Sequence, residues 1–296
     1  MFTYDRVAET IAGLRSKRLF FIGGCMKSGT TWLQLMLDSH PEISCNGEGH
    51  FVDGLALALG SGFDRYNRYI TGKNNEIFGE MQGYPSIDDD GFLYVVATAA
   101  SYALAMQSKG KDVPVVGEKT PNNIEYCPLL TQLFPGAKFI HIVRDGRDCA
   151  VSAWFHNQRV SPDWSKEKYT TLPEYLDPFI AAWINSVQAG VEFSESHPEQ
   201  YCEVRYEDLI ADPAPSVTRM LSFLGVSSSA AAVERCCTKG QFEALSGGRR
   251  PGQESKASFF RKGTIGDWRN HFDDAMNARF FDQAGALLTR FGYSRD

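Results

Sequence analysis

A glycine-rich turn between an apolar run and a helix-forming segment most constrains the fold of this 296-residue chain. Residues 19–24 read LFFIGG, and residues 31–38 continue with helix-compatible side chains until His40-Pro41 ends them. We therefore predict a strand, a tight loop and a helix. Glycines let such a loop approach an anion closely, and the free N–H groups of the helix start point at it. Lys27 adds a positive charge, so the turn is a predicted phosphate-binding loop.

Three further apolar runs indicate that the strand-to-helix order is repeated. The expected strands cover residues 113–117, 138–143 and 201–206, and helical segments are expected over 148–156 and 213–224. Strands that alternate with helices favour a mostly parallel central sheet covered on both faces, which is a three-layer α/β sandwich. Ligands of such folds bind at the carboxyl ends of the strands.

The remaining segments favour a single domain over residues 1–296. Residues 40–47 are expected to be a connection that leads the chain back towards the phosphate loop. Residues 240–272 are rich in Gly, Arg, Ser and Lys, and a long irregular loop of this kind is more often functional than a linker. Residues 273–291 fit a closing amphipathic helix.

Composition excludes several classes of protein. The net charge of −6 gives no general reason to expect nucleic acid or an anionic membrane as a partner, so any anion site must be local. No segment approaches the roughly 20 apolar residues that span a bilayer, and the N-terminus lacks the pattern of a secretory signal. We therefore expect a cytoplasmic protein. The seven cysteines are scattered without zinc-like pairs and are expected to be reduced thiols.

The phosphate loop departs from the Walker A pattern, in which Gly-Lys-Ser/Thr follows four residues after the first glycine. Here Lys27 precedes Ser28 and Gly29. No carboxylate-rich strand end offers a Mg²⁺ site, so we expect Lys and Arg to supply the charge, and no metal ligands. A kinase or NTPase, which remains the alternative enzyme class, requires both missing features.

Two later segments also suit phosphate. Residues 139–152 read FIHIVRDGRDCAVS, which places Arg144 at a strand end and Ser152 two turns into a helix. Arg147 and Asp148 are expected to form ion pairs at the helix start. Residues 259–272 read FFRKGTIGDWRNHF, where basic residues beside glycine again suit an anion.

These three segments together resemble the sulfotransferases that use 3′-phosphoadenosine 5′-phosphosulfate (PAPS). KSGTTW resembles their 5′-phosphosulfate loop, and Arg144 and Ser152 match the eight-residue spacing that binds the 3′-phosphate. Residues 259–272 are similar to the RKGxxGDWxNxF signature of the cytosolic branch, whereas residues 37–42 (LDSHPE) resemble the bacterial and tyrosylprotein branch. The resemblance implies a P-loop NTPase-like sulfotransferase fold.

The same resemblance assigns roles to individual positions. It implies a nucleotide-binding core over about 19–224, a lid over about 240–272, PAPS as donor and adenosine 3′,5′-bisphosphate (PAP) as product. Trp32 would lie near the adenine, and the lid would close over the 3′-phosphate. The nucleotide-binding residues implied are Lys27, Ser28, Gly29, Thr30, Thr31, Trp32, Arg144, Ser152, Tyr206, Phe242, Arg261, Lys262 and Gly263.

Sulfuryl transfer needs an in-line acceptor oxygen, a proton acceptor and positive charge on the departing oxygen. Lys27 and Lys119 are predicted to supply the charge. Cytosolic relatives carry a catalytic histidine where this chain has GEKTP, so that role does not transfer. The tyrosylprotein and heparan branches point instead to Glu48, with His50 and Glu118 as alternatives. Burial is expected to tune the proton affinity of Glu48 towards neutrality, against the charge of Lys27.

The acceptor is the least determined part of the prediction. Residues 51–110 and 161–175 are expected to line the acceptor mouth, and a small-molecule, glycan or lipid hydroxyl is left open. A homodimer is left open as well. The non-enzymatic alternative, a module that binds PAPS without turnover, predicts that a base or sulfate-side lysine is missing, and Lys27, Glu48 and Lys119 argue against it.

Overall fold

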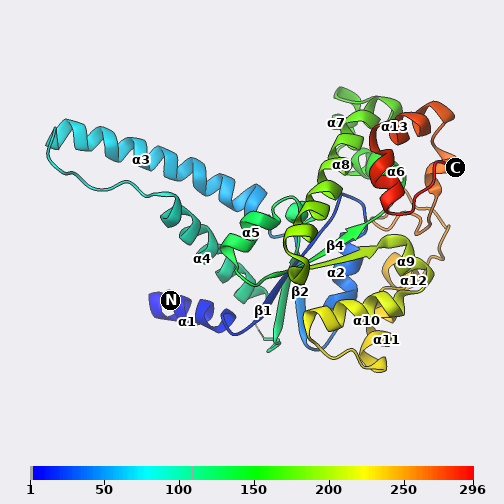
Figure 1. The fold of residues 1–296 in the computed structure, drawn as a ribbon, viewed down its shortest axis with the longest axis horizontal. Helices are drawn as coiled ribbons and strands as arrows, with labels where there is room; N and C mark the ends of the chain where they lie inside the picture. Colours follow the sequence, from blue (N-terminus) through cyan, green and yellow to red (C-terminus); the bar gives the residue numbers. More distant parts are fainter. Residues whose placement is uncertain (1–2, 109) are drawn as a thin grey trace.

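The computed structural model describes residues 3–108 and 110–296, and in this part of the chain five parallel strands form one sheet. Their order is β2-β3-β1-β4-β5 (Figure 1). The strands are β1 (Arg18–Gly23), β2 (Ile43–Gly47), β3 (Val115–Lys119), β4 (Lys138–Val143) and β5 (Tyr201–Arg205).

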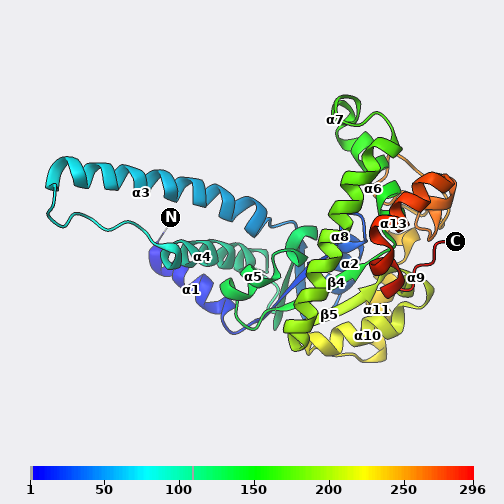
Figure 2. The ribbon, with the colours of Figure 1, turned by 45° about the horizontal axis from the view of Figure 1, so that its top comes forward.

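Helices cover both faces of this sheet, so the predicted three-layer α/β class is confirmed (Figures 1 and 2). The α-helices are α1 (Tyr4–Leu14), α2 (Thr30–Asp38), α3 (Leu57–Phe78), α4 (Asp89–Gln107), α5 (Cys127–Leu133), α6 (Gly146–Val160), α7 (Pro162–Glu167), α8 (Leu172–Ser196), α9 (Tyr206–Ala211), α10 (Pro213–Leu224), α11 (Ala230–Lys239), α12 (Phe242–Ser246) and α13 (Asp274–Arg290). Shorter turns are η1 (Phe51–Ala56), η2 (Pro121–Ile124), η3 (Pro198–Gln200) and η4 (Asp267–Asn270).

Alternation along the central strands decides which layer each side chain joins. In β1, Phe20 and Ile22 are buried against α2, α10 and α11, whereas Phe21 points to the opposite layer of α4 and α5. In β3, Gly117 lies so close to Phe20 that an added Cβ would come within 2.2 Å of the ring. A side chain at this position would therefore force the two central strands apart.

The expected elements agree with this arrangement except at the edges of the sheet. Strand 138–143 and helix 213–224 coincide with β4 and α10, and β3 starts two residues later than expected, after Pro114. Residues 40–47 were expected to lead the chain back to the phosphate loop, and within them Ile43–Gly47 forms the edge strand β2, which was not predicted as a strand. Its sequence, ISCNG, has little strand preference of its own, and pairing with β3 decides its conformation.

Helix α3 and the first half of α4 project from the body of the molecule as a long hairpin (Figures 1 and 2). Helix α3 follows η1, which itself begins directly after the loop that carries Glu48 and His50. None of the residues of α3 is buried. No helix within the described residues is both long enough and apolar enough to cross a membrane.

Candidate functional site

The predicted phosphate loop connects β1 to α2, and its backbone has the conformation that an anion site requires. Gly24 and Gly29 have φ angles of 153° and 106°, and Lys27, with φ 69°, is held in the left-handed region. A Cβ on Gly24 would lie 2.4 Å from the carbonyl oxygen of Ile142. Helix α2 starts at Thr30 without a side-chain cap, so its first N–H groups remain available to an anion.

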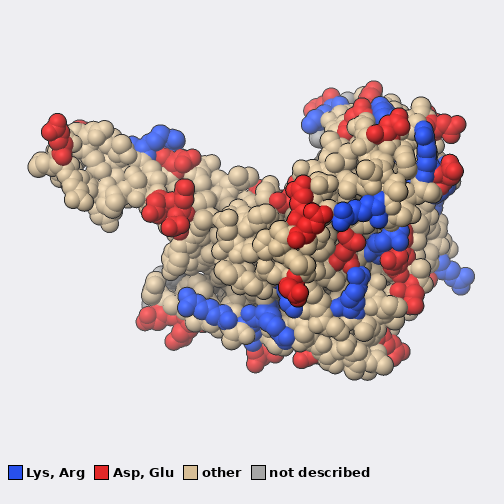
Figure 3. Space-filling model, in the orientation of Figure 1, with Lys and Arg blue, Asp and Glu red and all other residues tan. Residues whose placement is uncertain are grey.

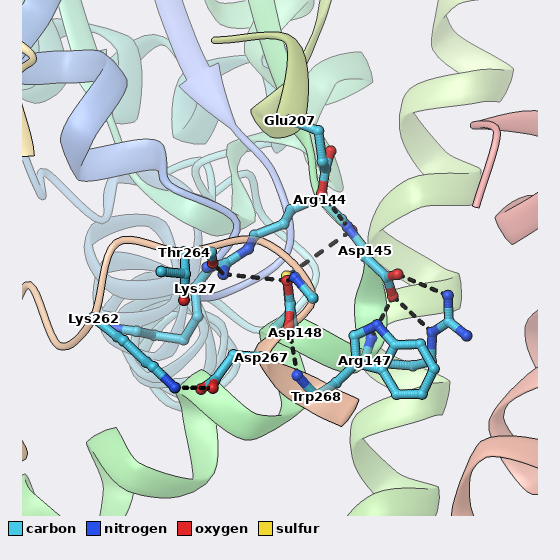
Figure 4. A network of polar contacts seen from close by, with 12 residues as sticks. Lys27, Arg144, Asp145, Arg147, Asp148, Glu207, Lys262, Thr264, Asp267 and Trp268 are labelled. Atoms are coloured by element: carbon cyan, nitrogen blue, oxygen red, sulfur yellow. Dashed lines mark hydrogen bonds and ion pairs between the residues drawn. The ribbon is translucent and has the colours of Figure 1, made fainter. Parts of the chain in front are cut away.

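Arg144 joins the phosphate loop to the lid. It lies at the end of β4, beside β1, and is 9% exposed. Its guanidinium donates to the carbonyl oxygen of Lys27 at 3.2 Å and to that of Thr264 at 3.2 Å (Figure 4). It also lies 4.2 Å from the ring centre of Tyr206. The two segments predicted to bind phosphate therefore meet at one arginine.

The lid is fixed to α6 by a buried carboxylate. Asp148 accepts hydrogen bonds from the backbone N–H groups of Gly266 at 2.7 Å and Trp268 at 2.9 Å, and lies 3.6 Å from Arg144 (Figure 4). Arg147 forms the expected ion pair at the helix start, with Asp145 at 2.8 Å. The prediction for Asp148 was incomplete, because its main partners come from residues more than 100 positions further along the chain.

The basic residues of the lid are held by Asp267. Arg261 and Lys262 both form ion pairs with this carboxylate, and Arg261 also reaches Glu254 at 2.6 Å. Burial disfavours the charged form of Asp267, but hydrogen bonds from Lys262, Arg261 and Asn270 outweigh burial and hold its pKa below the usual range. The lid therefore presents its cations in a fixed arrangement.

Arg249 is a structural residue of the lid that sequence reasoning missed. It donates to the backbone oxygens of Gln253, Arg261 and Phe260, and to the hydroxyl of Ser258 at 2.9 Å. One arginine thus closes a loop of irregular backbone. The only signal in the sequence is the Arg-Arg pair at 249–250, which does not distinguish a structural arginine from a ligand-binding one.

The loop, Arg144 and the lid enclose a cavity of about 270 Å³. Of the predicted site residues, all line it except Ser28, Lys119, His50 and the alternative base Glu118. Trp32 donates from its indole N–H to the carbonyl oxygen of Gly240 at 2.7 Å, and Gly263 lies against Phe242. Residues that line the cavity but were not predicted are Met26, Pro121, His156, Ile210, Gly240, Leu245, Phe259, Phe260 and Thr264.

At one end of this cavity, Lys119 and Glu48 form an ion pair. The Lys119 ammonium is almost fully buried and also donates to the hydroxyl of Thr31 at 3.0 Å, whereas Glu48 is 40% exposed. His50 lies 3.3 Å from the second Glu48 oxygen and 3.0 Å from Asp53. Burial raises the pKa of Glu48, but Lys119 and His50 outweigh it and lower the pKa overall. The expected tuning towards neutrality was therefore wrong, because the pairing with Lys119 was not foreseen.

Glu118 has a different environment from Glu48. Its carboxylate accepts hydrogen bonds from the Gly49 N–H, the Thr120 hydroxyl and the Asn123 amide, each at 2.7 Å. Burial raises the pKa of Glu118 more than these bonds lower it. Of these hydrogen bonds, the one from Gly49 holds the loop that carries Glu48.

The side chain of Lys27 lies between an imidazole and an aromatic ring. Its ammonium is 3.5 Å from Nδ1 of His156 and 4.3 Å from the ring centre of Phe259. Burial, assisted by Arg159 and Arg144, lowers the pKa of Lys27 to about 8. Burial together with Lys27 and Arg159 also lowers the pKa of His156, to about 4, so this imidazole is neutral near pH 7.

Several buried polar atoms around the cavity have no hydrogen-bond partner within the described part of the chain. They are Nε of Arg144, Nε of Arg261, Oγ1 of Thr264 and, in the loop, Oγ of Ser28. Buried polar groups are normally paired, and three such atoms on residues that line one cavity fit an anionic ligand with many acceptor oxygens. Within the described residues, no group of three or more His, Cys, Asp or Glu could hold a metal ion.

Comparisons with known proteins agree with this geometry. Residues 20–230 match the sequence profile of the sulfotransferase family. The chain is 30% identical to sulfotransferase 1C2 of Homo sapiens over 176 residues, 51% of this chain and 57% of that protein. It is 27% identical to protein-tyrosine sulfotransferase A of Caenorhabditis elegans over 216 residues, 72% of this chain and 51% of that protein. The chain thus spans about half the length of these curated relatives.

Solved structures show the same fold. A mouse sulfotransferase complexed with PAP superposes with a TM-score of 0.57 at 19% identity, over 95% of this chain and 88% of that one. A sulfotransferase from Mycobacterium avium superposes with a TM-score of 0.56 at 14% identity, over 98% of this chain and 81% of that one.

Proposed function

Because the chain belongs to the sulfotransferase family, we propose that it transfers a sulfuryl group from PAPS to an acceptor hydroxyl and releases PAP. The observation that carries the proposal is the position of Arg144, which bonds at once to the phosphate loop and to the lid. Two cationic segments on one cavity suit a ligand with two separate phosphate groups.

The cavity offers a distinct surface to each part of the donor. The loop around Lys27 and the start of α2 would hold the 5′-phosphosulfate, and Arg144, Ser152 and the lid would hold the 3′-phosphate. Trp32, Tyr206 and Phe242 give the cavity aromatic walls that suit the adenine.

Transfer forms a bond between the acceptor oxygen and sulfur and breaks the bond between sulfur and the bridging phosphate oxygen. The acceptor proton passes to Glu48, and the electron pair of the broken bond stays on the nucleotide. Lys27 and Lys119 would stabilise the charge that develops on the departing oxygen and on the transferred group. The Lys119 side chain is buried and that of Lys27 is half-buried, and a charge acts more strongly in such surroundings than in water.

The ion pair with Lys119 keeps Glu48 ionised at neutral pH, but by lowering its pKa it also makes the carboxylate a weaker proton acceptor while the pair is intact. A sulfate group arriving at the loop competes for the Lys119 ammonium and so releases the carboxylate towards the acceptor. His50, which lies beside Glu48 and is fixed by Asp53, is the alternative base.

Calorimetric titration tests the donor assignment directly. We expect PAP to bind more tightly than ATP with Mg²⁺, because Arg144, Arg261 and Lys262 offer positive charge to a second phosphate group. Tighter binding of ATP would overturn the proposal. Turnover is then measured with labelled PAPS and a panel of alcohols, phenols, glycans, hydroxylated lipids and tyrosine peptides. Binding of PAP without turnover on any member of that panel would favour the binding-module alternative.

A further inference from the structure

One side of helix α6 continues beyond the predicted phosphate residue Ser152. His156 and Arg159 follow it by four and seven positions, so the three side chains lie on the same side of the helix. Ser152 and His156 both line the cavity, and Arg159 reaches the His156 ring with its guanidinium. Neither His156 nor Arg159 belongs to a motif recognised in the sequence, and the fold brings both beside Lys27.

The contacts of His156 fix the state of its imidazole. Nδ1 lies 3.1 Å from Nη2 of Arg159 and 3.5 Å from Nζ of Lys27. A guanidinium and an ammonium donate hydrogen bonds and accept none, so Nδ1 must offer its lone pair to them. The imidazole is therefore neutral and carries its proton on Nε2. The pKa of His156 agrees, since burial, Lys27 and Arg159 lower it to about 4 against the opposing effect of Glu48.

The Lys27 ammonium lies between two electron-rich groups. The Nδ1 lone pair of His156 is 3.5 Å away, and the ring centre of Phe259, which belongs to the lid, is 4.3 Å away. The two rings are perpendicular, with their centres 6.1 Å apart. An ammonium has three N–H donors, so with these two partners one donor remains for a ligand in the cavity.

The charges around Lys27 determine the sign of any change made there. On the face shown in Figure 3, basic side chains on the body of the molecule lie among acidic ones. Around Lys27, by contrast, cations collect. Burial lowers its pKa most, and three cations that lower the pKa and one thiol that raises it act as well: Arg159, Arg144, Lys119 and Cys149. A lone pair beside an ammonium favours the charged form, so the lone pair of His156 opposes this repulsion.

We infer that His156 is a positioning residue, which holds the Lys27 ammonium so that its remaining N–H group meets the bridging oxygen between phosphate and sulfur. Arg159 fixes the imidazole through the same Nδ1 atom, and Phe259 adds the contact from the lid. His156 thus acts through Lys27 and not on the sulfuryl group itself. The inference rests on the proposed function, because the bridging oxygen belongs to PAPS.

NMR titration of the ligand-free full chain with isotope-labelled lysine tests the contact without any turnover. The Lys27 signal is identified by its loss in Lys27→Arg. In His156→Phe, which has a ring but no lone pair, the pKa of Lys27 should fall by about 0.5 or more. In His156→Asn, whose side-chain oxygen can take the position of Nδ1, it should stay near its original value. His197→Phe, the same exchange at the end of α8 and outside the cavity, is the matched control and should leave it unchanged.

Arg159→Gln separates the effect of the lone pair from that of the neighbouring charge. Glutamine keeps an N–H donor for Nδ1 of His156 but removes a positive charge, so the pKa of Lys27 should rise. His156→Phe and Arg159→Gln are therefore expected to change this pKa in opposite directions. A fall in both variants would overturn the inference, because it would show general damage to the end of α6.

Kinetics with PAPS measure the consequence for transfer. His156→Phe should lower kcat about 10- to 100-fold, the scale of a misplaced catalytic group. The Kd for PAP should stay unchanged, because the loop backbone, Arg144 and the lid still line the cavity. The decline of kcat/KM at high pH should begin at a lower pH in His156→Phe, and His156→Asn should recover most of the lost kcat.

The two kinds of measurement separate failure of this inference from failure of the proposed function. An unchanged pKa of Lys27 in His156→Phe would overturn the inference, whatever the turnover. Equal losses of kcat in His156→Phe and His156→Asn would also overturn it, because the lone pair would then not matter. If the pKa changes as expected but the unmodified chain transfers no sulfuryl group, the proposed function fails, and with it the role in transfer, while the contact between His156 and Lys27 stands.

Discussion

The cavity and the arm, which is the projecting hairpin of residues 57–95, differ in the kind of side chain that each leaves uncovered. Around the cavity, charged side chains are buried, and several of their polar atoms have no partner within the described residues. On the arm, polar groups are satisfied by local hydrogen bonds, and apolar side chains are exposed instead. Buried polar atoms without a partner indicate that an ionic ligand binds in the cavity. Exposed apolar side chains indicate a surface that contacts another molecule.

The two regions also differ in the sequence distance between the residues that hold their side chains in place. Arg144, Asp148 and Asp267 are held by bonds between distant segments, so the cavity depends on the whole fold. The arm is held by bonds between residues 10 and 20 positions apart. Changes in the cavity should therefore alter ligand binding and catalysis, and changes at exposed residues of the arm should leave PAP binding unaltered.

The largest effect is expected at the carboxylate beside the cavity. Glu48→Gln should lower kcat about 100-fold or more, the usual scale for a lost general base, while the Kd for PAP stays unchanged. Steady-state kinetics and calorimetry measure the two quantities, with Glu234→Gln, an exposed carboxylate on α11, as control. Near-normal turnover of Glu48→Gln would move the base to His50.

A smaller effect is expected where the loop meets the lid. Arg144→Lys keeps the charge but loses the two-pronged contact with the carbonyl oxygens of Lys27 and Thr264. Affinity for PAP should fall about 10- to 100-fold. Arg205→Lys, at the end of the neighbouring strand β5, is the matched control and should bind PAP normally. Equal losses in both variants would show that the arginine at the end of β4 has no special role.

The pH dependence of the reaction tests whether Lys27 is a buried cation of the cavity. Its pKa is lowered to about 8, and only the protonated form supplies positive charge. The value of kcat/KM should therefore be highest below pH 8 and fall about tenfold for each pH unit well above it. In Lys27→Arg the residual activity should no longer fall above pH 8, since arginine stays protonated. If kcat/KM of Lys27→Arg still falls above pH 8, the decline is caused by the titration of another residue.

The smallest effect is expected from the arm. Tyr69→Glu should change the Kd for PAP by less than about twofold, the usual range for an exposed substitution. Calorimetry on the variant measures this. A large loss of PAP affinity would break the contrast between the two regions, because it would show that the arm supports the cavity through η1 and the Glu48 loop.

Much of the site follows from short-range chemistry. The positive φ angles of Gly24 and Gly29, the position of Lys27 in the loop and that of Arg144 at a strand end all depend on a few neighbouring residues. Such features can be predicted from sequence because the backbone preferences of glycine and the charge of lysine act locally. The strand β2, which was not predicted, and the proton affinity of Glu48, which was predicted wrongly, both depend on partners far away in the chain, β3 and Lys119.

The lid shows the same limit of prediction from sequence. Its basic residues were predicted, but not the Asp148 carboxylate and the Arg249 side chain that hold it. The exposure of the arm was not foreseen either, because residues 51–110 were expected to line the acceptor mouth. No described residue of that range lines the cavity, so the position of the acceptor mouth stays a prediction.

The sequence by itself determined the α/β class, the central strands β1, β3, β4 and β5 and the family, and it predicted the three anion-binding segments, because these depend on local patterns of apolar, glycine and basic residues. Only the tertiary structure decided that Lys119 pairs with Glu48, that Asp148 carries the lid and that α3 leaves the body. Such pairings depend on which strands lie side by side, and strand neighbours are chosen by the burial of the whole core.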